Sequence, residues 1–279
     1  MEKNIVELAN NKKQLSIFVD SYDGNKDLWK NLFDVFDYFW PNCPYDRYLV
    51  TNSESFSRKK INVIKTGEEV NWFSTTLNAL KQIDTKYIWF FLDDYYLSKM
   101  ISNDDIEEII NYMDNNDIFF YRLSLRSDLD KKYIRHQITG ESVYAINLQP
   151  VIWNRENFIS KLEMLQTLGC KSPWDFERYF INYFENKKSK EIISGIIYDT
   201  RDIMGFKNAV IQGKWVRHVI KFYKDEFGII LDIGSRECMS YFAEFFDYVK
   251  TKGNNFISYK TKKKMKKILK CFGFKFMTD

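Results

Sequence analysis

Short apolar runs alternate with helically spaced apolar positions over the first hundred residues. The runs have the length and the β-branched and aromatic residues of buried strands, and they cover residues 14–20, 47–51, 61–64 and 87–92. Between them, segments 26–40 and 72–83 repeat apolar residues at the spacing of a helix. Strands and helices that alternate in this way predict an α/β fold, in which a mainly parallel central sheet carries helices on both faces.

The pattern becomes less regular beyond residue 100. The sequence predicts further elements at 103–108 (a capped helix start), 118–125 (strand), 143–153 (a strand interrupted by Pro150), 155–168 (helix), 172–177 (helix start) and 192–198 (strand). There is no internal repeat and no long flexible linker. We therefore predict one domain over residues 1–230 and a C-terminal extension over 231–279.

The most informative feature is the pair Asp93 and Asp94, which follows the apolar strand predicted at 87–92 directly. Burying an unpaired carboxylate costs several kcal/mol, so the pair needs water at the surface or a bound cation. In open α/β sheets, ligands bind beyond the carboxyl ends of the strands, where the turn 21–24 should also lie. One or two carboxylates together with substrate phosphates are a common way to hold Mg²⁺ or Mn²⁺. An ordinary solvated turn is the alternative.

Composition narrows the class of protein. A hydrophobic content of 45% supplies the core of one large domain. The four cysteines are far apart and form no CxxC pair, and there are only two histidines, so neither a zinc site nor a disulfide framework is indicated. The N-terminus lacks a basic region followed by an apolar one, and no apolar run approaches the ~18 residues of a spanning helix. We expect a cytoplasmic protein.

The formal charge of the chain is unevenly distributed. Residues 250–279 contain ten lysines and one acid, Asp279, which gives this tail +9 and leaves −5 for the rest of a chain whose total is +4. Apolar residues are interleaved with the lysines between 260 and 277. Such a basic amphipathic tail predicts binding to an anionic membrane surface. Nucleic-acid binding is the alternative, and the absence of arginines and of a known nucleic-acid module argues against it.

Six short segments stand in order along the chain: 20–25 (Asp-Ser-Tyr-Asp-Gly-Asn), 48–52 (Tyr-Leu-Val-Thr-Asn), 91–97 (Phe-Leu-Asp-Asp-Tyr-Tyr-Leu), 149–153 (Gln-Pro-Val-Ile-Trp), 172–177 (Ser-Pro-Trp-Asp-Phe-Glu) and 212–215 (Gln-Gly-Lys-Trp). In this order they resemble bacterial GT-A-type glycosyltransferases related to family 2, of the kind found in capsule and lipopolysaccharide gene clusters. The resemblance implies a GT-A (Rossmann-like) fold and transfer of a sugar from a nucleotide-diphosphate sugar.

The resemblance also implies roles for residues at the sheet edge. Asp94 stands where the family's DxD motif holds Mn²⁺ or Mg²⁺ on the donor diphosphate, and Asp93 assists it on the donor side. This chain departs from the motif because no spacer separates its two aspartates. Ser21, Tyr22 and Asp23 match the place where the family holds the nucleoside, although a simple turn between strand and helix explains their spacing equally well.

Inverting transfer needs a base that takes the proton of the acceptor hydroxyl. Asp175, at the start of the helix predicted from residue 172, resembles the family's acidic motif near the acceptor and is the candidate base. Trp174 offers an apolar face on which a sugar ring can stack, and Glu177 is assigned to the acceptor site with it. A helix attracts acids to its first turn through its macrodipole, which gives both carboxylates a structural explanation as well.

Three basic residues complete the predicted site. Arg122, with Arg126, forms a fork suited to phosphate and is assigned to the donor. Lys214 is also assigned to the donor, although the GxxxxGK[ST] spacing of a Walker loop is absent. His218 lies four residues beyond Lys214, on the same helical face, and is assigned to the metal. Arginines placed for solubility and a packed or solvated histidine are the alternatives.

The sequence therefore predicts a glycosyltransferase that extends a glycan or a lipid-linked glycan in bacterial surface polysaccharide synthesis, with inversion, at the inner face of the cell membrane. Its predicted partners are a nucleotide-diphosphate sugar, the glycan acceptor and the anionic membrane surface, and no nucleic acid. Two other functions stay open. One is a metal-dependent nucleotidyl- or phosphotransferase, and the other is a non-catalytic protein that binds membrane or nucleic acid.

Overall fold

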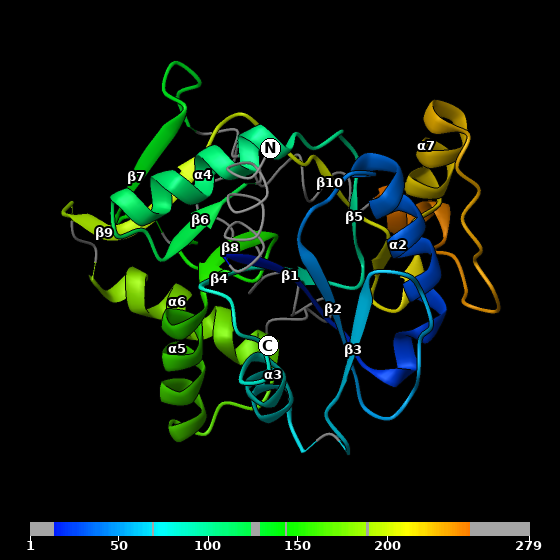
Figure 1. The fold of residues 1–279 in the computed structure, drawn as a ribbon, viewed down its shortest axis with the longest axis horizontal. Helices are drawn as coiled ribbons and strands as arrows, with labels where there is room; N and C mark the ends of the chain where they lie inside the picture. The colour runs from blue at the N-terminus through cyan, green and yellow to red at the C-terminus, as the bar shows by residue number, and fades with distance from the viewer. Residues whose placement is uncertain (1–13, 69, 124–128, 143, 188–189, 246–279) are drawn as a thin grey trace, which may run out of the picture. The chain divides into compact units, whose positions relative to one another are not determined.

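The computed structural model of the chain describes residues 14–68, 70–123, 129–142, 144–187 and 190–245. These residues divide into two compact units, and the second begins at Ala209. The elements of the first unit are β1 (Leu15–Asp20), η1 (Asp23–Asn25), α2 (Lys26–Phe39), β2 (Asp46–Thr51), β3 (Ile61–Lys65), α3 (Trp72–Leu80), β4 (Tyr87–Leu92), β5 (Tyr95–Leu97), α4 (Asn103–Asn115), β6 (Phe120–Arg122), β7 (Arg135–Thr139), β8 (Val151–Asn154), α5 (Arg155–Thr167), α6 (Pro173–Lys187), β9 (Ile192–Asp199) and β10 (Phe206–Asn208) (Figure 1).

An eight-stranded sheet with the order β3-β2-β1-β4-β8-β6-β9-β7 forms the centre of the first unit. Strands β3, β2, β1 and β4 are parallel neighbours, and β6 is parallel to β9. Only β8, between β4 and β6, and β7, beside β9, run against their neighbours. The mainly parallel α/β sheet predicted from the sequence, and implied by the GT-A resemblance, is confirmed.

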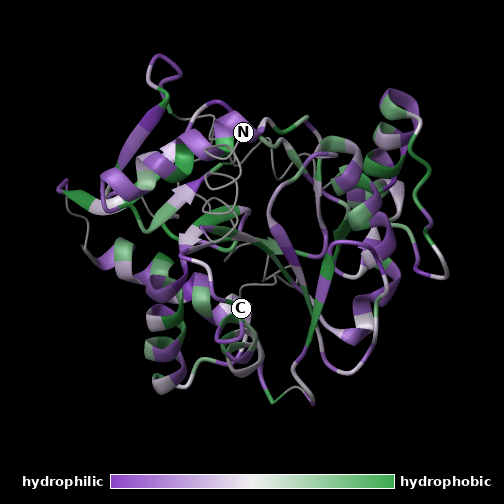
Figure 2. Cartoon of the chain, viewed as in Figure 1, coloured by the Kyte–Doolittle hydropathy of each residue, from purple (hydrophilic) through white to green (hydrophobic). Residues whose placement is uncertain are grey.

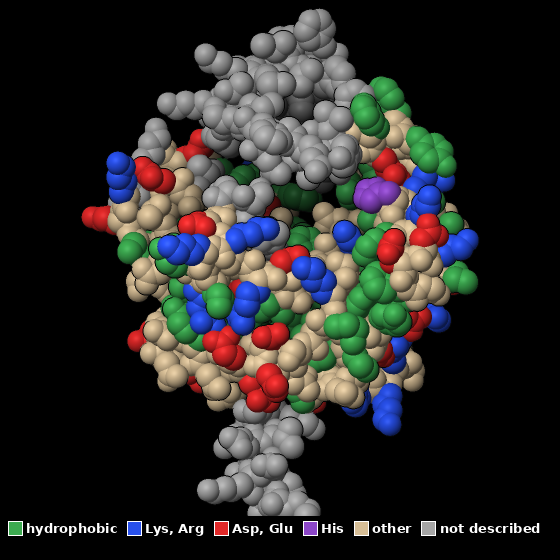
Figure 3. Space-filling view, turned by 90° about the horizontal axis from the view of Figure 1, so that it is seen from above, with side chains coloured by type: hydrophobic (Ala, Val, Ile, Leu, Met, Phe, Trp, Pro, Cys, Tyr) green, Lys and Arg blue, Asp and Glu red, His purple; other side chains and the backbone are tan. Residues whose placement is uncertain are grey.

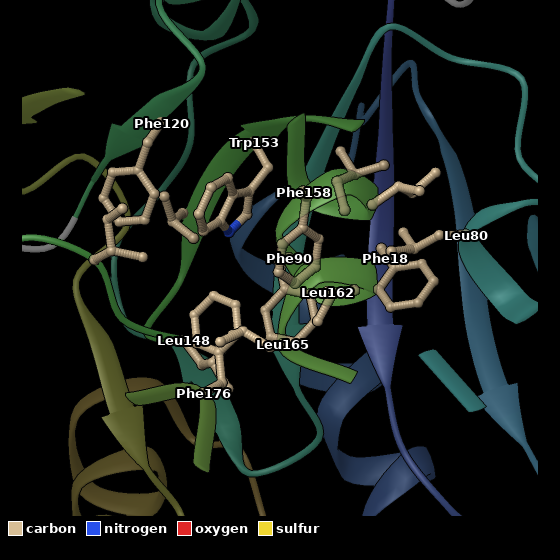
Figure 4. Close-up of a cluster of buried hydrophobic side chains, with 14 of the residues drawn as sticks. Phe18, Leu80, Phe90, Phe120, Leu148, Trp153, Phe158, Leu162, Leu165 and Phe176 are labelled. Atoms are coloured by element: carbon tan, nitrogen blue, oxygen red, sulfur yellow. The ribbon is translucent and has the colours of Figure 1, made fainter. Parts of the chain in front are cut away.

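Strand β4 shows why helices cover both faces of the sheet, since successive side chains of a strand point to opposite faces. Phe90 packs against Phe158 of α5, with their ring centroids 5.4 Å apart. The preceding residue, Trp89, packs against Trp40 at the end of α2, with their ring centroids 5.5 Å apart. Figure 4 shows the layer on the Phe90 side, which strands β1, β4, β6 and β8 form with helices α3, α5 and α6. Figure 2 shows helices of this unit with hydrophobic and hydrophilic residues on separate stripes.

The early elements agree with the sequence prediction to within a few residues, and the later ones agree less well. The helix predicted at 72–83 ends at Leu80, and the strand predicted at 118–125 is described only at Phe120–Arg122. Of the strand predicted at 143–153, only the part after Pro150 forms β8, and it runs antiparallel to its neighbours. The proline has no N–H to donate to a ladder, so the pairing begins after it.

The second unit contains a small hairpin, β11 (Val210–Ile211) and β12 (Lys214–Trp215), followed by helix α7 (Arg217–Phe227). Gln212 and Gly213 form the hairpin turn with φ of 52° and 73°, a conformation that two-residue hairpins need at both positions. This unit begins at Ala209, and the boundary predicted after residue 230 stays a prediction. The Lys-rich tail, residues 250–279, lies outside the described residues. None of the helices in the described part of the chain is long and apolar enough to span a bilayer.

Candidate active site

Strands β1 and β4 bring two of the predicted motifs together at the carboxyl edge of the sheet. The strands are parallel and in register, with Asp20 opposite Leu92, so the turns that follow them start at the same level. Ser21 Oγ donates a hydrogen bond to Asp93 Oδ2, and Asn25 Nδ2 donates to Asp93 Oδ1 at 3.2 Å. Asp93 is buried, and these two hydrogen bonds fix the position of the turn that follows β1. The prediction that both turns lie at this edge is confirmed.

Asp94 occupies the turn between β4 and β5, and its carboxylate is not satisfied by the described protein. Its Oδ1 is buried and accepts no hydrogen bond from any described residue. Burial, and then the neighbouring carboxylate of Asp93, raise the pKa of Asp94 from its ordinary 3.8 to about 8. A buried acceptor without a partner costs about 1–3 kcal/mol, and more when it is charged. Asp94 Oδ1 is therefore an acceptor that a proton or a bound ligand can satisfy.

The residues around Asp94 can hold Mn²⁺ or Mg²⁺ only with help from a ligand. No group of three or more His, Cys, Asp or Glu side chains suited to a metal occurs in the described ranges. Asp94 offers an unoccupied oxygen, whereas the two oxygens of Asp93 already accept hydrogen bonds. Mg²⁺ is commonly held by one or two carboxylates plus substrate phosphates and water. The chemistry of this donor set fits that pattern.

Asp23 lies in the turn after β1, as predicted, and its assigned role at the donor stays a prediction. Its carboxylate accepts hydrogen bonds from the backbone N–H groups of Asn52, Ser53 and Glu54, at 2.9–3.2 Å, and from Ser53 Oγ at 2.7 Å. Desolvation opposes ionisation of Asp23, but these hydrogen bonds outweigh it and lower its pKa. Asp23 thus clamps the turn after β1 to the loop after β2. A nucleoside would meet Tyr22 beside it, which is 47% exposed.

A second cluster combines residues from three further elements. Arg122, the last residue of β6, is only 7% exposed, donates to Gln149 Oε1, and lies with its guanidinium 5.0 Å from the ring centroid of Tyr198. Glu177 of α6 accepts a hydrogen bond from Leu148 N at 3.2 Å. Burial raises the pKa of Glu177, against the lowering effects of the Leu148 hydrogen bond and the Arg122 charge.

Tyr95, the first residue of β5, connects the two clusters. Burial raises the pKa of its hydroxyl well above the ordinary value, and the charges of Asp94 and Glu177 raise it further, whereas Arg122 lowers it. These electrostatic couplings place Asp94, Glu177 and Arg122 in one neighbourhood around Tyr95. The structure thus brings together a predicted metal ligand, a predicted acceptor residue and a predicted donor residue that are up to 83 positions apart in the sequence.

Asp175 caps the helix on which it lies. Its Oδ2 accepts hydrogen bonds from Lys171 N at 3.0 Å, from Ser172 N at 2.9 Å and from Ser172 Oγ at 2.9 Å, and Arg178 pairs with its Oδ1. Asp175 N in turn donates to Ser172 Oγ, which completes a capping box. The backbone hydrogen bond from Lys171, with the partners Arg178 and Ser172, outweighs desolvation and holds the pKa of Asp175 well below its usual range. This geometry favours the capping interpretation over a general base.

The structure also shows a site residue that the sequence left unassigned. Asp20, at the end of β1, is buried and accepts hydrogen bonds from Trp72 Nε1 at 2.5 Å and from Thr76 Oγ1 at 3.3 Å. Trp72 N donates to Lys171 O at 3.1 Å, just before α6. Asp20 therefore ties the sheet edge to α3, and α3 to the start of α6. A carboxylate at the end of an apolar strand, as at Asp93, was the sequence signal for it.

The other predicted site residues lie in different surroundings. Trp174 is 46% exposed at the start of α6, where a ligand can reach its ring. Lys214 and His218 belong to the second unit, in which Lys214 Nζ pairs with Glu237 at 2.6 Å and His218 Nδ1 lies 3.3 Å from Glu244 Oε2. Their assigned roles at the donor and the metal stay predictions.

The sequence matches no family model and no curated protein. Among solved structures, a 1–349 fragment of S. aureus TarS is 12% identical with a TM-score of 0.40, covering 67% of this chain and 60% of the fragment. The same fragment in complex with UDP-GlcNAc is 13% identical with a TM-score of 0.36, covering 55% and 47%. A cytidylyltransferase from Leptospira borgpetersenii serovar Hardjo-bovis is 14% identical with a TM-score of 0.41, covering 87% and 96%.

This chain spans between 29% and 60% of the TarS chains that it matches. At these TM-scores the similarities carry no argument about substrate or reaction.

Proposed function

We propose that this chain is a glycosyltransferase that moves a sugar from a nucleotide-diphosphate sugar to a glycan or lipid-linked acceptor, as the resemblance to bacterial surface-polysaccharide enzymes implies. One observation carries the proposal. One oxygen of the Asp94 carboxylate, Oδ1, is buried without a described hydrogen-bond partner at the carboxyl edge of a mainly parallel sheet, beside the turn that Asp93 holds. Ligands of such sheets bind at this edge, and an unsatisfied carboxylate there fits a cation carried in by a diphosphate.

Four residues bind the donor in this proposal. Asp94 holds Mn²⁺ or Mg²⁺, with Asp93 fixing the position of the adjoining turn at Ser21. When bound, the ion supplies positive charge against the leaving diphosphate. Arg122 is buried and always charged, so it adds a second cation to the same neighbourhood. Tyr22 presents its exposed ring for stacking with the nucleobase.

Of the two predicted site acids on α6, Glu177 suits the role of base better than Asp175. A general base works best when its pKa lies near the working pH. Burial moves the pKa of Glu177 in that direction, whereas the capping hydrogen bonds move the pKa of Asp175 away from it. Glu177 also belongs to the neighbourhood of Asp94, through Tyr95. When the base takes the proton of the acceptor hydroxyl, that oxygen attacks the anomeric carbon as the nucleoside diphosphate leaves from the opposite face, and this single displacement gives inversion.

A screen of nucleotide sugars by thermal unfolding, with and without Mn²⁺, tests donor binding, because a ligand of the native state raises its melting temperature by mass action. We expect one nucleobase series to stabilise the protein in a Mn²⁺-dependent manner, and incubation with acceptor glycans to release a nucleoside diphosphate. Release of pyrophosphate would replace the proposal with nucleotidyl transfer. Stabilisation by no donor at all would leave a non-catalytic binding protein.

A matched pair of variants tests the base. Glu177→Gln should reduce transfer by about 10²–10⁴-fold, the contribution of a general base, while leaving donor binding intact. Asp175→Asn should transfer at a near-normal rate and melt at a lower temperature, since it weakens a cap worth about 1 kcal/mol. The reverse pattern of rates would return the role of base to Asp175.

The Lys-rich segment 250–279 supports a location at the inner face of the membrane. Near an anionic lipid surface, each lysine contributes about 1 kcal/mol to the binding free energy. A lipid-linked acceptor would be presented at the same surface. We expect no nucleic-acid partner. Binding of anionic vesicles in preference to RNA at equal phosphate concentration checks this location.

A further inference from the structure

A small cavity lies at the amino edge of the sheet, where strands β2 and β3 begin, and it has a volume of about 190 Å³. One water needs about 10–15 Å³ of such space, whereas sites for drug-sized ligands span about 300–1,000 Å³. The cavity therefore has the size for a small group such as phosphate. It belongs to the first unit and lies at the edge of the sheet opposite Asp94. Three basic residues, an acid, an aromatic ring and a thiol contribute to its lining: Arg47, Lys59, Lys60, Asp37, Trp40 and Cys43.

Arg47 is a buried cation of this lining, and part of its hydrogen-bonding capacity is unused. It is only 3% exposed, and its Nη1 donates a hydrogen bond to Asp37 Oδ1. Its Nε is buried, and neither Nε nor Nη2 donates to any residue in the described part of the chain. These two nitrogens form one edge of the guanidinium, and arginine binds oxyanions through such an edge with two parallel hydrogen bonds. Since buried donors nearly always have acceptors, this edge calls for an acceptor from outside the described residues.

The positive charge of the lining exceeds its negative charge. Asp37 is the one acid of the lining, and Arg58 also donates to its Oδ2 through Nε and Nη2, so two arginines already neutralise it. Lys59 and Lys60 are exposed, and neither forms an ion pair with a described acid. Figure 3 shows the usual arrangement at several other places on the described surface, where Lys and Arg side chains (blue) lie beside Asp and Glu side chains (red). The two lysines therefore provide a surplus of positive charge that an anion can neutralise.

The backbone of Lys60 supports a role for its charge. Its φ is 65°, in the left-handed region that a residue with a Cβ adopts at an energetic cost and that asparagine and glycine adopt more readily. The turn that contains it is closed by Ile61 N, which donates to Arg58 O at 3.2 Å. Arg58 in turn pairs with Asp34 and Asp37 of α2, so the turn is fixed against that helix. Backbone strain of this kind concentrates at binding sites.

We propose that Arg47, Lys59 and Lys60 form an oxyanion site that binds the phosphate group of a phosphate ester. The unused edge of Arg47 donates to the phosphate oxygens, and the two lysines neutralise its charge. The site lies at the opposite edge of the sheet from the candidate transfer site, and it does not rest on the proposed function. A small soluble phosphate ester and the headgroup of an anionic lipid share this chemistry.

Equilibrium dialysis of the full-length chain against radiolabelled inorganic phosphate, in a chelator and at constant ionic strength, tests the proposal. We expect wild type to bind phosphate. The double variant Lys59→Gln/Lys60→Asn removes both exposed charges, and asparagine accepts the backbone conformation of residue 60. Its dissociation constant for phosphate should be about tenfold higher or more. Lys131→Gln/Lys132→Gln removes the same charge from another exposed pair in the first unit and is the matched control, with unchanged phosphate binding.

Two competitors identify the source of the phosphate group. Displacement of the labelled phosphate by glucose 1-phosphate indicates a soluble ester as the ligand. Displacement by vesicles that contain phosphatidic acid, and not by glucose 1-phosphate, indicates a lipid headgroup. Either result supports the oxyanion site, provided that the double variant at residues 59 and 60 loses it.

Three outcomes would overturn the proposal. No phosphate binding by wild type at millimolar concentration would leave the cavity to water. Equal affinity of wild type and the Lys59→Gln/Lys60→Asn variant would assign the bound phosphate to another part of the chain, such as Arg122. An equal loss of affinity in the control would reduce the effect to the net charge of the protein. Nucleotide-sugar binding by the Lys59→Gln/Lys60→Asn variant should equal that of wild type, which separates this test from that of the transfer reaction.

Discussion

Replacement of Asp94 by asparagine should make the metal-free protein more stable and inactive at once. The substitution keeps the shape of the side chain and removes the charge that the fold leaves without a hydrogen-bond partner at Oδ1. Because the native pKa of Asp94, about 8, lies above its ordinary 3.8, the native state binds the proton more tightly than the unfolded state does. The buried Asp94 carboxyl therefore does not lower the free energy of unfolding below about pH 4. Its destabilising effect grows between pH 4 and pH 8 and is constant above pH 8.

The magnitude follows from the pKa. At pH 7 the unfolded carboxylate is ionised, and keeping a proton on it in the native state costs about 1.4 kcal/mol for each of about three pH units, or at most about 4 kcal/mol. Relaxation and water entry around a half-buried turn reduce this to about 2 kcal/mol. For a chain of this size, that corresponds to a rise in melting temperature of about 4–8 °C.

Thermal unfolding of wild type and Asp94→Asn between pH 4 and pH 9, with and without Mn²⁺, measures this effect. We expect the two proteins to be equally stable near pH 4, and Asp94→Asn to be the more stable at pH 8 without metal. Mn²⁺ with a nucleoside diphosphate should stabilise only wild type, and transfer should require Asp94. Lower stability of Asp94→Asn at pH 8, or equal stabilisation of both proteins by Mn²⁺, would refute the assignment of Asp94 as an unsatisfied metal ligand.

Three further predictions concern the core and the pH profile. Trp153 has a buried Nε1 without a described partner, and its ring stacks on that of Phe158 with the centroids 4.7 Å apart. We expect Trp153→Phe to lower the free energy of unfolding by less than about 1.5 kcal/mol and Trp153→Ala to lower it by about 3–5 kcal/mol, as measured by urea unfolding. Gly195→Ala should lower stability by about 1–3 kcal/mol, since φ is 80° and a Cβ would lie 2.5 Å from the Phe119 ring; unchanged unfolding would contradict this close approach. The acid limb of the transfer rate should lie above the ordinary Glu pKa of 4.5 because burial raises the pKa of Glu177, and a limb that persists in Glu177→Gln would assign it to another group.

The sequence was most informative about the sheet edge. The apolar run that ends at Asp93 and Asp94 indicated a buried strand followed by charge, and alternation with helices indicated parallel strands whose carboxyl ends meet. Together these patterns predicted that the turn at Ser21 and the Asp93 turn lie at the same edge of the sheet, and the hydrogen bond between Ser21 and Asp93 confirms it. Local periodicity sufficed here because the carboxyl ends of parallel strands lie along the same edge of a sheet, even for strands as far apart in the chain as β1 and β4.

The roles of individual carboxylates could not be predicted in the same way. Asp23, Asp94 and Asp175 look alike in the sequence, each an acid at the start of a helix or the end of a strand. In the structure, Asp23 accepts hydrogen bonds from a loop about 30 positions away, Asp175 accepts them from its own helix cap, and Asp94 Oδ1 accepts none from the described residues. The pKa of a carboxylate depends on these partners and on burial, which no residue pattern states.

The sequence by itself determined the alternation of strands and helices, the common edge at which the turns after the parallel strands lie, and the charge of the tail, because these follow from local periodicity and composition. Only the tertiary structure decided that β8 inserts antiparallel between β4 and β6, and that this insertion sets Arg122 and Glu177 near Asp94. The physical reason is that pairing between distant strands and the burial of single charges, such as that of Asp94, are set by the packing of the whole unit.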